Sequence, residues 1–279
     1  MKPISDKNFA VNRSGFTLVE LAVVIGLIAV LAALMLPAIG ATKPGAMPAH
    51  CLNNQRQLAL AWQMYASDNA DSLISPTAWI STSGGFMDWT ASASNTNTAA
   101  LTDPSQALIG AYIRNATVFK CPADNYQSAA NPGPRVRSIS CNLALGSFPT
   151  FKNQNGFTYF SAKKITDLAK PGPARTFVFV DEHPDSIDDG AFALDPGYAI
   201  GSEKWRNLPA SYHNGAAGIS FTDGHADLHA WVDKGTHTGQ PQTFYPVLFI
   251  NYSSVPAPWS TAGSQKLDYE WLEGGMPYQ

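Results

Sequence analysis

The densest run of chemically active side chains lies at residues 181–190, where carboxylates crowd into a short segment. The candidate ligands in this acidic segment are Asp181, Glu182, Asp185, Asp188 and Asp189. Ca²⁺ takes six to eight oxygen ligands, and acidic side chains close together on a loop after a strand are able to supply them. The spacing differs from that of an EF-hand, and Asp also stabilises turns and helix starts. The segment predicts a candidate Ca²⁺ site, with a structural role for these acids as the alternative.

A second group of titratable residues comprises His213, Asp223, His225 and His229. On a strand, His225, Asp227 and His229 project to the same face, because alternate residues share a side. Two histidines and one aspartate at that spacing are compatible with Zn²⁺. The competing interpretation is structural: Asp223 shapes a turn, and His213 bonds to the backbone near it. We favour this structural interpretation.

The sequence holds none of the short motifs that mark a catalytic centre. It lacks a glycine-rich phosphate loop, a Gly-x-Ser-x-Gly elbow, a His-Glu-x-x-His motif and a Cys-x-x-Cys pair. Serine, histidine and aspartate are present, but no local arrangement singles out a nucleophile. We therefore predict that the chain is not an enzyme.

Four short strands are expected to position the candidate residues. Runs of strand-like composition, each bounded by turn residues, occur at 135–142, 176–180, 218–221 and 226–231. Asp223 and Gly224 lie between the last two runs and predict a two-residue hairpin turn of type I′. These runs predict an antiparallel sheet in the second half of the chain.

A helix is expected before the sheet. Apolar residues recur at helical spacing from 51 to 70 and share one face: Leu52, Leu58, Ala59, Trp62, Tyr65 and Ala66. Two prolines and a glycine at 43–48 are expected to end or kink a helix there. Residues 75–105 are rich in Ser, Thr and Asn, with Trp79 and Trp89 interspersed, and predict a long surface loop.

Apolar residues are concentrated near the N-terminus. Residues 21–36 carry no charged side chain, and at about 1.5 Å per residue the segment 16–39 is long enough to cross a hydrocarbon core of roughly 30 Å. The leader before it carries three basic residues against one acid, which favours a cytoplasmic N-terminus with the head across the membrane. No Ala-x-Ala cleavage site follows the run, so we expect the segment to be retained.

The residues just before this run carry a resemblance to a known family. Residues 15–21 read Gly-Phe-Thr-Leu-Val-Glu-Leu. This segment resembles the class III signal of type IV pilins and type II secretion pseudopilins. The resemblance implies that prepilin peptidase cleaves between Gly15 and Phe16 and methylates the new amino terminus. It also places Glu20 and Pro37 at positions where the family usually has those residues.

Glu20 needs a partner if the helix lies in a membrane. A carboxylate at membrane depth costs roughly 2.5–3.5 kcal/mol. Cleavage after Gly15 frees an ammonium group on Phe16, and a neighbouring subunit's Glu20 can neutralise that group inside an apolar bundle. The pair is therefore expected to act in assembly.

The head resembles a prepilin-like group with a His-x9-Asp-Gly signature. His213, nine further residues and then Asp223 and Gly224 match that signature. Segments 51–58, 119–124 and 180–184 also resemble blocks of the group. The biochemical role of the group is poorly defined, so the resemblance implies architecture more than activity.

The chain has three cysteines, an odd number for a head that is expected to face an oxidising compartment. Cys51 and Cys121 both lie in segments that resemble the second group. The resemblance favours a disulfide between them that ties the helix to the head. A bridge from Cys121 to Cys141 is the first alternative, and buried free thiols are the second.

Composition limits the class of protein. The 279 residues are 45% apolar and 14% charged, whereas an ordinary soluble domain is roughly 25% charged. With 18 basic and 21 acidic residues, the chain has no basic surplus for phosphate, so nucleic acid is not an expected partner. We expect an α+β, type IV pilin-like fold in which a long hydrophobic N-terminal helix packs on an antiparallel sheet.

The expected parts are a cleaved leader (1–15), a transmembrane and assembly helix (16–41), a second helix half (42–70) and a head (71–279). The expected function is that of a structural subunit of a type IV pilus-like filament or a type II secretion pseudopilus. Its expected partners are copies of itself or related pilins, prepilin peptidase, the assembly platform and the inner membrane, with the head in the periplasm before assembly. The alternatives are a minor pseudopilin that primes or tips a pseudopilus, and an anchored enzyme or ligand-binding head.

Overall fold

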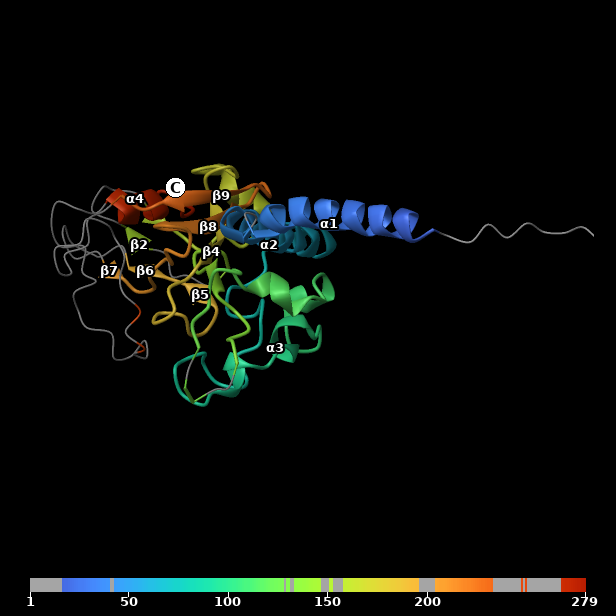
Figure 1. Ribbon diagram of the computed structural model, residues 1–279. Coiled ribbons are helices and arrows are strands. Elements are labelled where there is room, and N and C mark those ends of the chain that lie inside the picture. The colour runs from blue at the N-terminus through green and yellow to red at the C-terminus, as the bar shows by residue number, and fades with distance from the viewer. Residues whose placement is uncertain are drawn as a thin grey trace, which may run out of the picture. The chain divides into compact units, whose positions relative to one another are not determined.

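The chain divides into two units, Met1–Ala46 and Met47–Gln279 (Figure 1). The computed structural model describes residues 17–40, 43–127, 129–130, 133–146, 151–152, 158–195, 204–232, 247, 249 and 267–279. The leader and both residues of the expected cleavage site, Gly15 and Phe16, lie outside the described residues.

The first unit contains helix α1 (Leu18–Gly40), which begins with a capping box. The Glu20 N–H donates to Thr17 Oγ1 at 3.3 Å, and the Thr17 N–H donates back to Glu20 Oε2 at 2.8 Å. Pro37 lies inside α1. The apolar side chains of the helix are exposed from Leu18 to Leu31. Within the described part of the chain, no helix combines the length and apolar character that a membrane crossing requires.

Helix α2 (Lys43–Asp68) includes the residues that were expected to break it. Pro48 lies inside the helix, so the prolines and glycine at 43–48 do not end α2, which spans nearly all of the second helix half expected at 42–70. Pro44 is tolerated because it lies in the first turn, where the N–H groups have no partner within the helix. The buried face of α2 is formed by Cys51, Gln55, Leu58, Ala59, Ala61, Trp62 and Ala66.

The head is built on a five-stranded sheet in the order β5-β1-β4-β8-β9. Its strands are β1 (Ile139–Asn142), β4 (Phe177–Asp181), β5 (Ala191–Phe192), β8 (Ala216–Phe221) and β9 (Ala226–Ala230). Neighbours are antiparallel except β1 and β5, which are parallel. The α+β class is therefore confirmed, but the sheet is mixed rather than antiparallel, because the segment after β4 carries the chain to the far side of β1.

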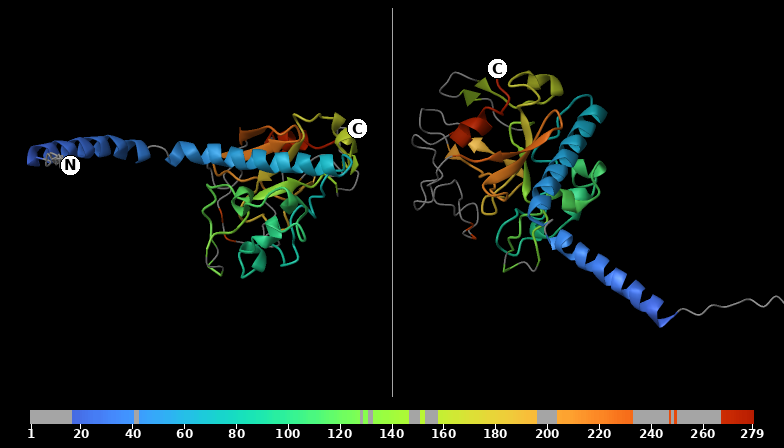
Figure 2. Two further views of the ribbon diagram at one scale, coloured as in Figure 1. Left: turned by 90° about the vertical axis from the view of Figure 1, so that its right-hand side faces the viewer. Right: turned by 45° about the horizontal axis from the view of Figure 1, so that its top comes forward.

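Helix α2 lies along β8 and the turn that follows it (Figure 2). Gln55 Nε2 donates to the Gly218 carbonyl at 3.0 Å, and Gln63 Nε2 donates to the Thr222 carbonyl at 2.9 Å. Leu58 and Trp62 belong to the same buried cluster as Phe179 of β4. The amphipathic pattern of α2 is therefore used to dock the helix on the head.

The remaining elements of the head are short. Two further pairs of strands are β2 (Phe151–Lys152) with β3 (Thr158–Tyr159), and β6 (Leu194–Asp195) with β7 (Lys204–Trp205). The helices are η1 (Ala93–Asn95), α3 (Ala99–Thr102), η2 (Leu108–Ala111), η3 (Ala116–Phe119), η4 (Ile165–Ala169) and α4 (Leu267–Glu273).

The β8–β9 turn differs from the expected two-residue type I′ turn. The Phe221 N–H donates to the His225 carbonyl at 2.9 Å across a three-residue loop, and the Gly224 N–H donates to the Phe221 carbonyl at 2.9 Å. Only Gly224 of this loop has a positive φ, at 92°. A three-residue loop with glycine in the left-handed region is the next commonest hairpin connection. The Asp223 carboxylate accepts the His225 N–H at 3.1 Å and fixes the turn.

Residues 75–105 are not a surface loop throughout, as their polar composition predicted. Trp79 is completely buried, and Ile80, Met87 and Trp89 are also buried. Trp79 lies between Phe119 and Phe179, with ring centroids 5.8 Å and 4.9 Å away. The polar residues between these anchors form turns, so the segment covers one side of the core with little regular structure.

Candidate functional site

Four side chains from distant segments meet beneath α2. The donor atoms of Cys51, Cys121, Asp181 and His213 all lie within 4.8 Å of one another. Cys51 Sγ is 3.0 Å from Asp181 Oδ2, Cys121 Sγ is 3.2 Å from His213 Nε2, and His213 Nε2 is 4.0 Å from Asp181 Oδ2. We call these four residues the Cys-Asp-His cluster.

The secondary structure explains why these side chains meet. Cys51 lies on the buried face of α2, Cys121 follows η3, Asp181 ends β4, and His213 precedes β8. The Gly218 N–H donates to Asp181 Oδ2 at 2.9 Å. A Cβ atom at Gly218 would lie 2.7 Å from Cys51 Sγ and 2.9 Å from Asp181 Oδ2, so glycine is needed where the helix meets the strand.

The cluster is almost free of solvent. Cys51, Cys121 and Asp181 are completely buried, and the His213 side chain is 3% exposed. Burial raises the pKa of Asp181 to about 6, although hydrogen bonds from Cys51, Gly218 and Gln55 act in the opposite direction. The pKa of the Cys51 thiol is raised by its hydrogen bond with Cys121, by burial and by the Asp181 charge. Burial lowers the pKa of His213.

The three cysteines are free and buried in the structure. The Cys51–Cys121 disulfide that we expected is therefore not formed, although the two sulfur atoms lie in one cluster. Cys141 lies outside the cluster and belongs to the apolar core. Two thiols, an imidazole and a carboxylate offer the donors that a transition metal binds.

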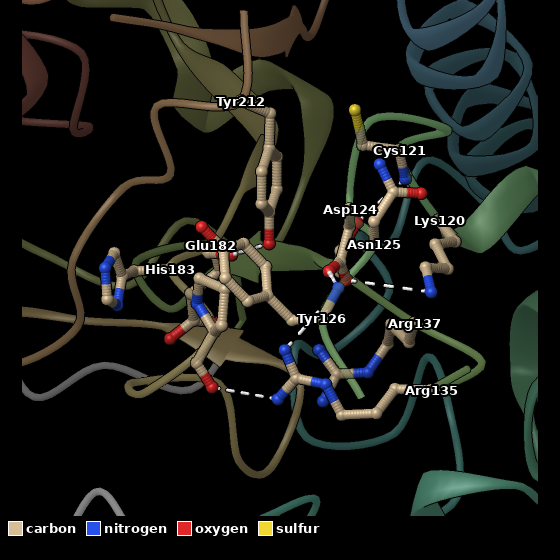
Figure 3. A network of polar contacts seen from close by, with 12 residues as sticks. Lys120, Cys121, Asp124, Asn125, Tyr126, Arg135, Arg137, Glu182, His183 and Tyr212 are labelled. Atoms are coloured by element: carbon tan, nitrogen blue, oxygen red, sulfur yellow. Dashed lines mark hydrogen bonds and ion pairs between the residues drawn. The ribbon is translucent and has the colours of Figure 1, made fainter. Parts of the chain in front are cut away.

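A polar network adjoins the cluster on the Cys121 side (Figure 3). Asp124 Oδ2 is 3.9 Å from both Lys120 Nζ and the nearest Arg135 nitrogen, and Arg135 donates to the Pro184 carbonyl at 2.8 Å. Burial raises the pKa of Asp124, against the charges of Arg135 and Lys120. Cys121, Lys120, Asp124 and Arg135 line a cavity of about 430 Å³. One edge of the cluster therefore borders an open space.

The acidic segment does not form the expected Ca²⁺ site. Among the described residues, one group of ligand atoms converges as a metal site requires, and Asp181 is the sole member of the acidic segment in it. The other four acids bond to protein groups instead. Glu182 accepts from Ser140, Ser186 and Asn207; Asp185 accepts from Trp89; Asp188 Oδ1 and Asp189 Oδ1 accept backbone N–H groups. These bonds stabilise the segment that connects β4 to β5. They agree with the structural role of the acids, which was the alternative to Ca²⁺ binding.

The expected histidine triad is also not assembled. His225, Asp227 and His229 are absent from the converging group that the described residues contain. His225 bonds to Asp223 at 2.5 Å and stacks on Phe221, whereas His229 stacks on Trp271 with ring centroids 3.6 Å apart. The structural interpretation holds for Asp223, which shapes the turn by accepting the His225 N–H. For His213 it is incomplete, because its side chain joins the Cys-Asp-His cluster.

Acidification from pH 6.5 to pH 4 is expected to destabilise the head through His229. Burial and the nearby Arg175 charge lower the pKa of His229 from 6.5 to about 4, so the unfolded chain binds this proton first. The stabilising contribution is complete above pH 6.5 and is lost as the pH falls through 4. After allowance for partial exposure, the expected loss is on the order of 1–2 kcal/mol.

Urea unfolding at pH 7 and pH 4.5 measures this loss. His229→Phe keeps the ring stack on Trp271 and should reduce the difference between the two pH values. His225→Phe, which keeps a ring against Phe221 on the exposed turn, is the matched control. An unchanged pH dependence in His229→Phe would assign the effect to other groups.

Sequence reasoning did not bring the Cys-Asp-His cluster together. Each member lies in one of four segments that were expected to match the prepilin-like group. The two cysteines were expected to form a disulfide, whereas Asp181 was assigned to a Ca²⁺ site and His213 to the turn. The sequence did contain a signal for this cluster, because each of the four distant segments includes a side chain that is able to bind a metal. Gln55, which binds both Asp181 Oδ1 and the Gly218 carbonyl, was missed because a glutamine on a helix gives no such signal.

Comparison with known proteins identifies a match in the N-terminal region. No curated protein and no solved structure matches the chain. The family described as the prokaryotic N-terminal methylation motif matches residues 11–36. This match covers Gly15, Phe16 and Glu20, and it is consistent with a prepilin-type signal.

Proposed function

We propose that this chain is a prepilin-like structural subunit, cleaved between Gly15 and Phe16 and assembled through α1 into a pilus-like or pseudopilus-like filament. The observation that carries the proposal is the methylation motif at residues 11–36, which includes the expected cleavage site and most of α1. Before assembly, the N-terminal segment holds the subunit at the cytoplasmic membrane, with the head on the outer side. The role is structural rather than catalytic.

The surface of α1 supports this proposal. Glu20 is its single ionisable residue, and the apolar side chains from Leu18 to Leu31 are exposed. An apolar helix surface of this size requires lipid or neighbouring helices around it. Helices of identical subunits provide such neighbours, so the same surface serves for storage at the membrane and for polymerisation.

Mass spectrometry of the membrane-extracted protein tests the processing step. The expected amino terminus is an N-methylated Phe16 in cells that contain prepilin peptidase. A Gly15→Val variant should keep the leader and serves as the comparison. An intact Met1 terminus on the unmodified chain, in cells with an active peptidase, contradicts the proposal.

Glu20→Gln separates the charge of this residue from its capping role. Glutamine at the third helical position also completes a capping box, so α1 and the cleavage step should be preserved. The variant removes the partner of the Phe16 ammonium group, and breaking a buried ion pair costs about 3–5 kcal/mol. We expect at least a tenfold loss of sheared filaments relative to membrane-bound subunit, measured by immunoblot.

Glu20→Ala provides the comparison for this test. It removes both the cap and the charge, so it should lose filaments at least as strongly as Glu20→Gln. Normal filament yield in Glu20→Gln together with a loss in Glu20→Ala would assign Glu20 a capping role alone. Normal yield in both variants would contradict assembly through this residue.

A further inference from the structure

We propose that Cys51, Cys121, Asp181 and His213 form a structural Zn²⁺ site that fastens α2 to the head. The donor set is two sulfurs, one imidazole nitrogen and one carboxylate oxygen. Structural zinc sites are four-coordinate, with ligands of these three types. Two thiolates favour zinc over the hard cations Ca²⁺ and Mg²⁺, which take oxygen ligands.

The distances between the donor atoms fit this coordination. With Zn–S near 2.3 Å and Zn–N and Zn–O near 2.1 Å, neighbouring ligand atoms of a tetrahedral site lie about 3.3–3.8 Å apart. The observed separations are 3.0 Å (Cys51 to Asp181), 3.2 Å (Cys121 to His213) and 4.0 Å (His213 to Asp181), and no pair exceeds 4.8 Å. Small side-chain movements are sufficient to accommodate the ion.

Residues around the cluster hold the ligands in place. Gln55 Nε2 donates to Asp181 Oδ1 at 3.3 Å and leaves Oδ2 directed at the cluster, where the Gly218 N–H also holds it. The Cys121 N–H donates to Ser138 Oγ at 2.7 Å, which fixes the backbone of that ligand. Such outer partners are a regular part of metal sites, because they orient the ligands.

The surroundings indicate a structural rather than a catalytic ion. Four protein ligands fill a tetrahedral shell and leave no position for water or substrate. The ligands are buried, and the cavity of about 430 Å³ that Cys121 borders provides an entry path. Each ligand comes from a different segment, so one ion links α2, the segment after η3, β4 and the segment before β8.

Zinc binding and disulfide formation are mutually exclusive uses of the two thiols. Coordination replaces the two S–H protons by bonds to Zn²⁺, releases two protons and transfers no electrons. A Cys51–Cys121 disulfide would release two protons and two electrons, and it needs an oxidant. The bound ion would therefore keep both sulfurs reduced in an oxidising compartment.

Element analysis of the full chain, purified under reducing conditions and incubated with Zn²⁺, tests the proposal. We expect about one Zn²⁺ per chain after removal of free metal. Cys121→Ser should lose most of this zinc, whereas Cys141→Ser removes a buried thiol outside the cluster and should retain it. Comparable loss of zinc in both folded variants would overturn the assignment.

Gln55→Ala is a milder variant that leaves all four ligands present. Loss of an outer partner typically weakens metal affinity 10- to 100-fold, and we expect a weakening in this range in a competition titration with a zinc chelator. Gln57→Ala, on the exposed face of the same helix, is the matched control and should bind zinc normally. Equal affinities for the two variants would contradict the role of Gln55.

Two measurements on the unmodified chain need no variant. In the first, substitution of Co²⁺ for Zn²⁺ should give the visible and charge-transfer absorption of a tetrahedral thiolate site. In the second, added Zn²⁺ should raise the melting temperature of the protein and protect two thiols from alkylation. Absence of metal binding together with an unchanged melting temperature would overturn the proposal. So would a native chain that carries the Cys51–Cys121 disulfide and binds no zinc after reduction.

Discussion

Trp79→Ala is expected to lower the free energy of unfolding of the head by about 3–5 kcal/mol. Trp79 is completely buried and packs between Phe119 and Phe179. Its indole N–H donates to the Gly190 carbonyl at 3.0 Å, at the point where the β4–β5 crossover ends. Truncation leaves a large cavity in the core and removes one of the two hydrogen bonds to the Gly190 carbonyl, which still accepts the Cys141 N–H at 2.8 Å. Chemical denaturation of the two proteins measures the cost.

Trp79→Phe divides this cost into its two parts. Phenylalanine keeps an aromatic ring between Phe119 and Phe179 but loses the hydrogen bond. We expect a loss of about 0.5–1.5 kcal/mol, because the Gly190 carbonyl keeps its bond from the Cys141 N–H. Phe86→Ala is the control, because Phe86 is 59% exposed and its removal should change stability by less than about 0.5 kcal/mol. A Trp79→Ala effect as small as that of Phe86→Ala would show that Trp79 is not part of the core.

Arg137→Met should cost a similar amount, about 3–5 kcal/mol, through a different mechanism. The Arg137 side chain is buried and donates to the carbonyls of Ile139 and Asp188, at 2.9 Å and 3.1 Å. It also donates to Ser140 Oγ, which in turn donates to Glu182. Burial raises the pKa of Glu182 to about 8, and the Arg137 charge opposes this rise. Removal of the guanidinium leaves two buried carbonyls and an acid without their cationic partner.

A double-mutant cycle with Glu182→Gln separates these contributions. Glutamine removes the ionisable acid but can still accept the hydrogen bond from Asn207. The loss of stability in the double variant should therefore be about 0.5–3 kcal/mol smaller than the sum of the two single losses. Arg114→Met, at an exposed arginine, should be nearly neutral. Strict additivity between Arg137→Met and Glu182→Gln would show that the two side chains are not coupled.

The sequence predicts the central strands well because their signal is local. Each expected run coincides or overlaps with an observed strand, in chain order β1, β4, β8 and β9. The signal is local because each run combines β-branched or aromatic residues with a turn at its end. β5 was missed because two residues, Ala191 and Phe192, carry no periodicity, and with it the parallel pair was missed. Trp79 was assigned to a surface loop because composition records the polar neighbours and not the tertiary contacts.

The candidate site depends on long-range contacts that no local pattern contains. Asp181 was selected as a candidate ligand together with its sequence neighbours Glu182 and Asp185, but those two side chains bond elsewhere. Its actual neighbours, Cys51 and His213, come from the helix and from the approach to β8. His225 lies just before β9 and His229 lies within it, and each is stacked on a different aromatic ring.

The long separation between α2 and its docking strand has a consequence for the order of folding. Gln55 bonds to Gly218, and Arg56 bonds to Ala226, across 163 and 170 residues. During synthesis from the N-terminus, α2 emerges long before β8 and β9, so Leu58 and Trp62 have no native surface to cover them at that stage. Such distant pairings fold slowly, because a long loop must close before the contacts stabilise it. The head thus completes its core only after most of the chain has been made, and a truncation before β8 would leave α2 without its docking surface.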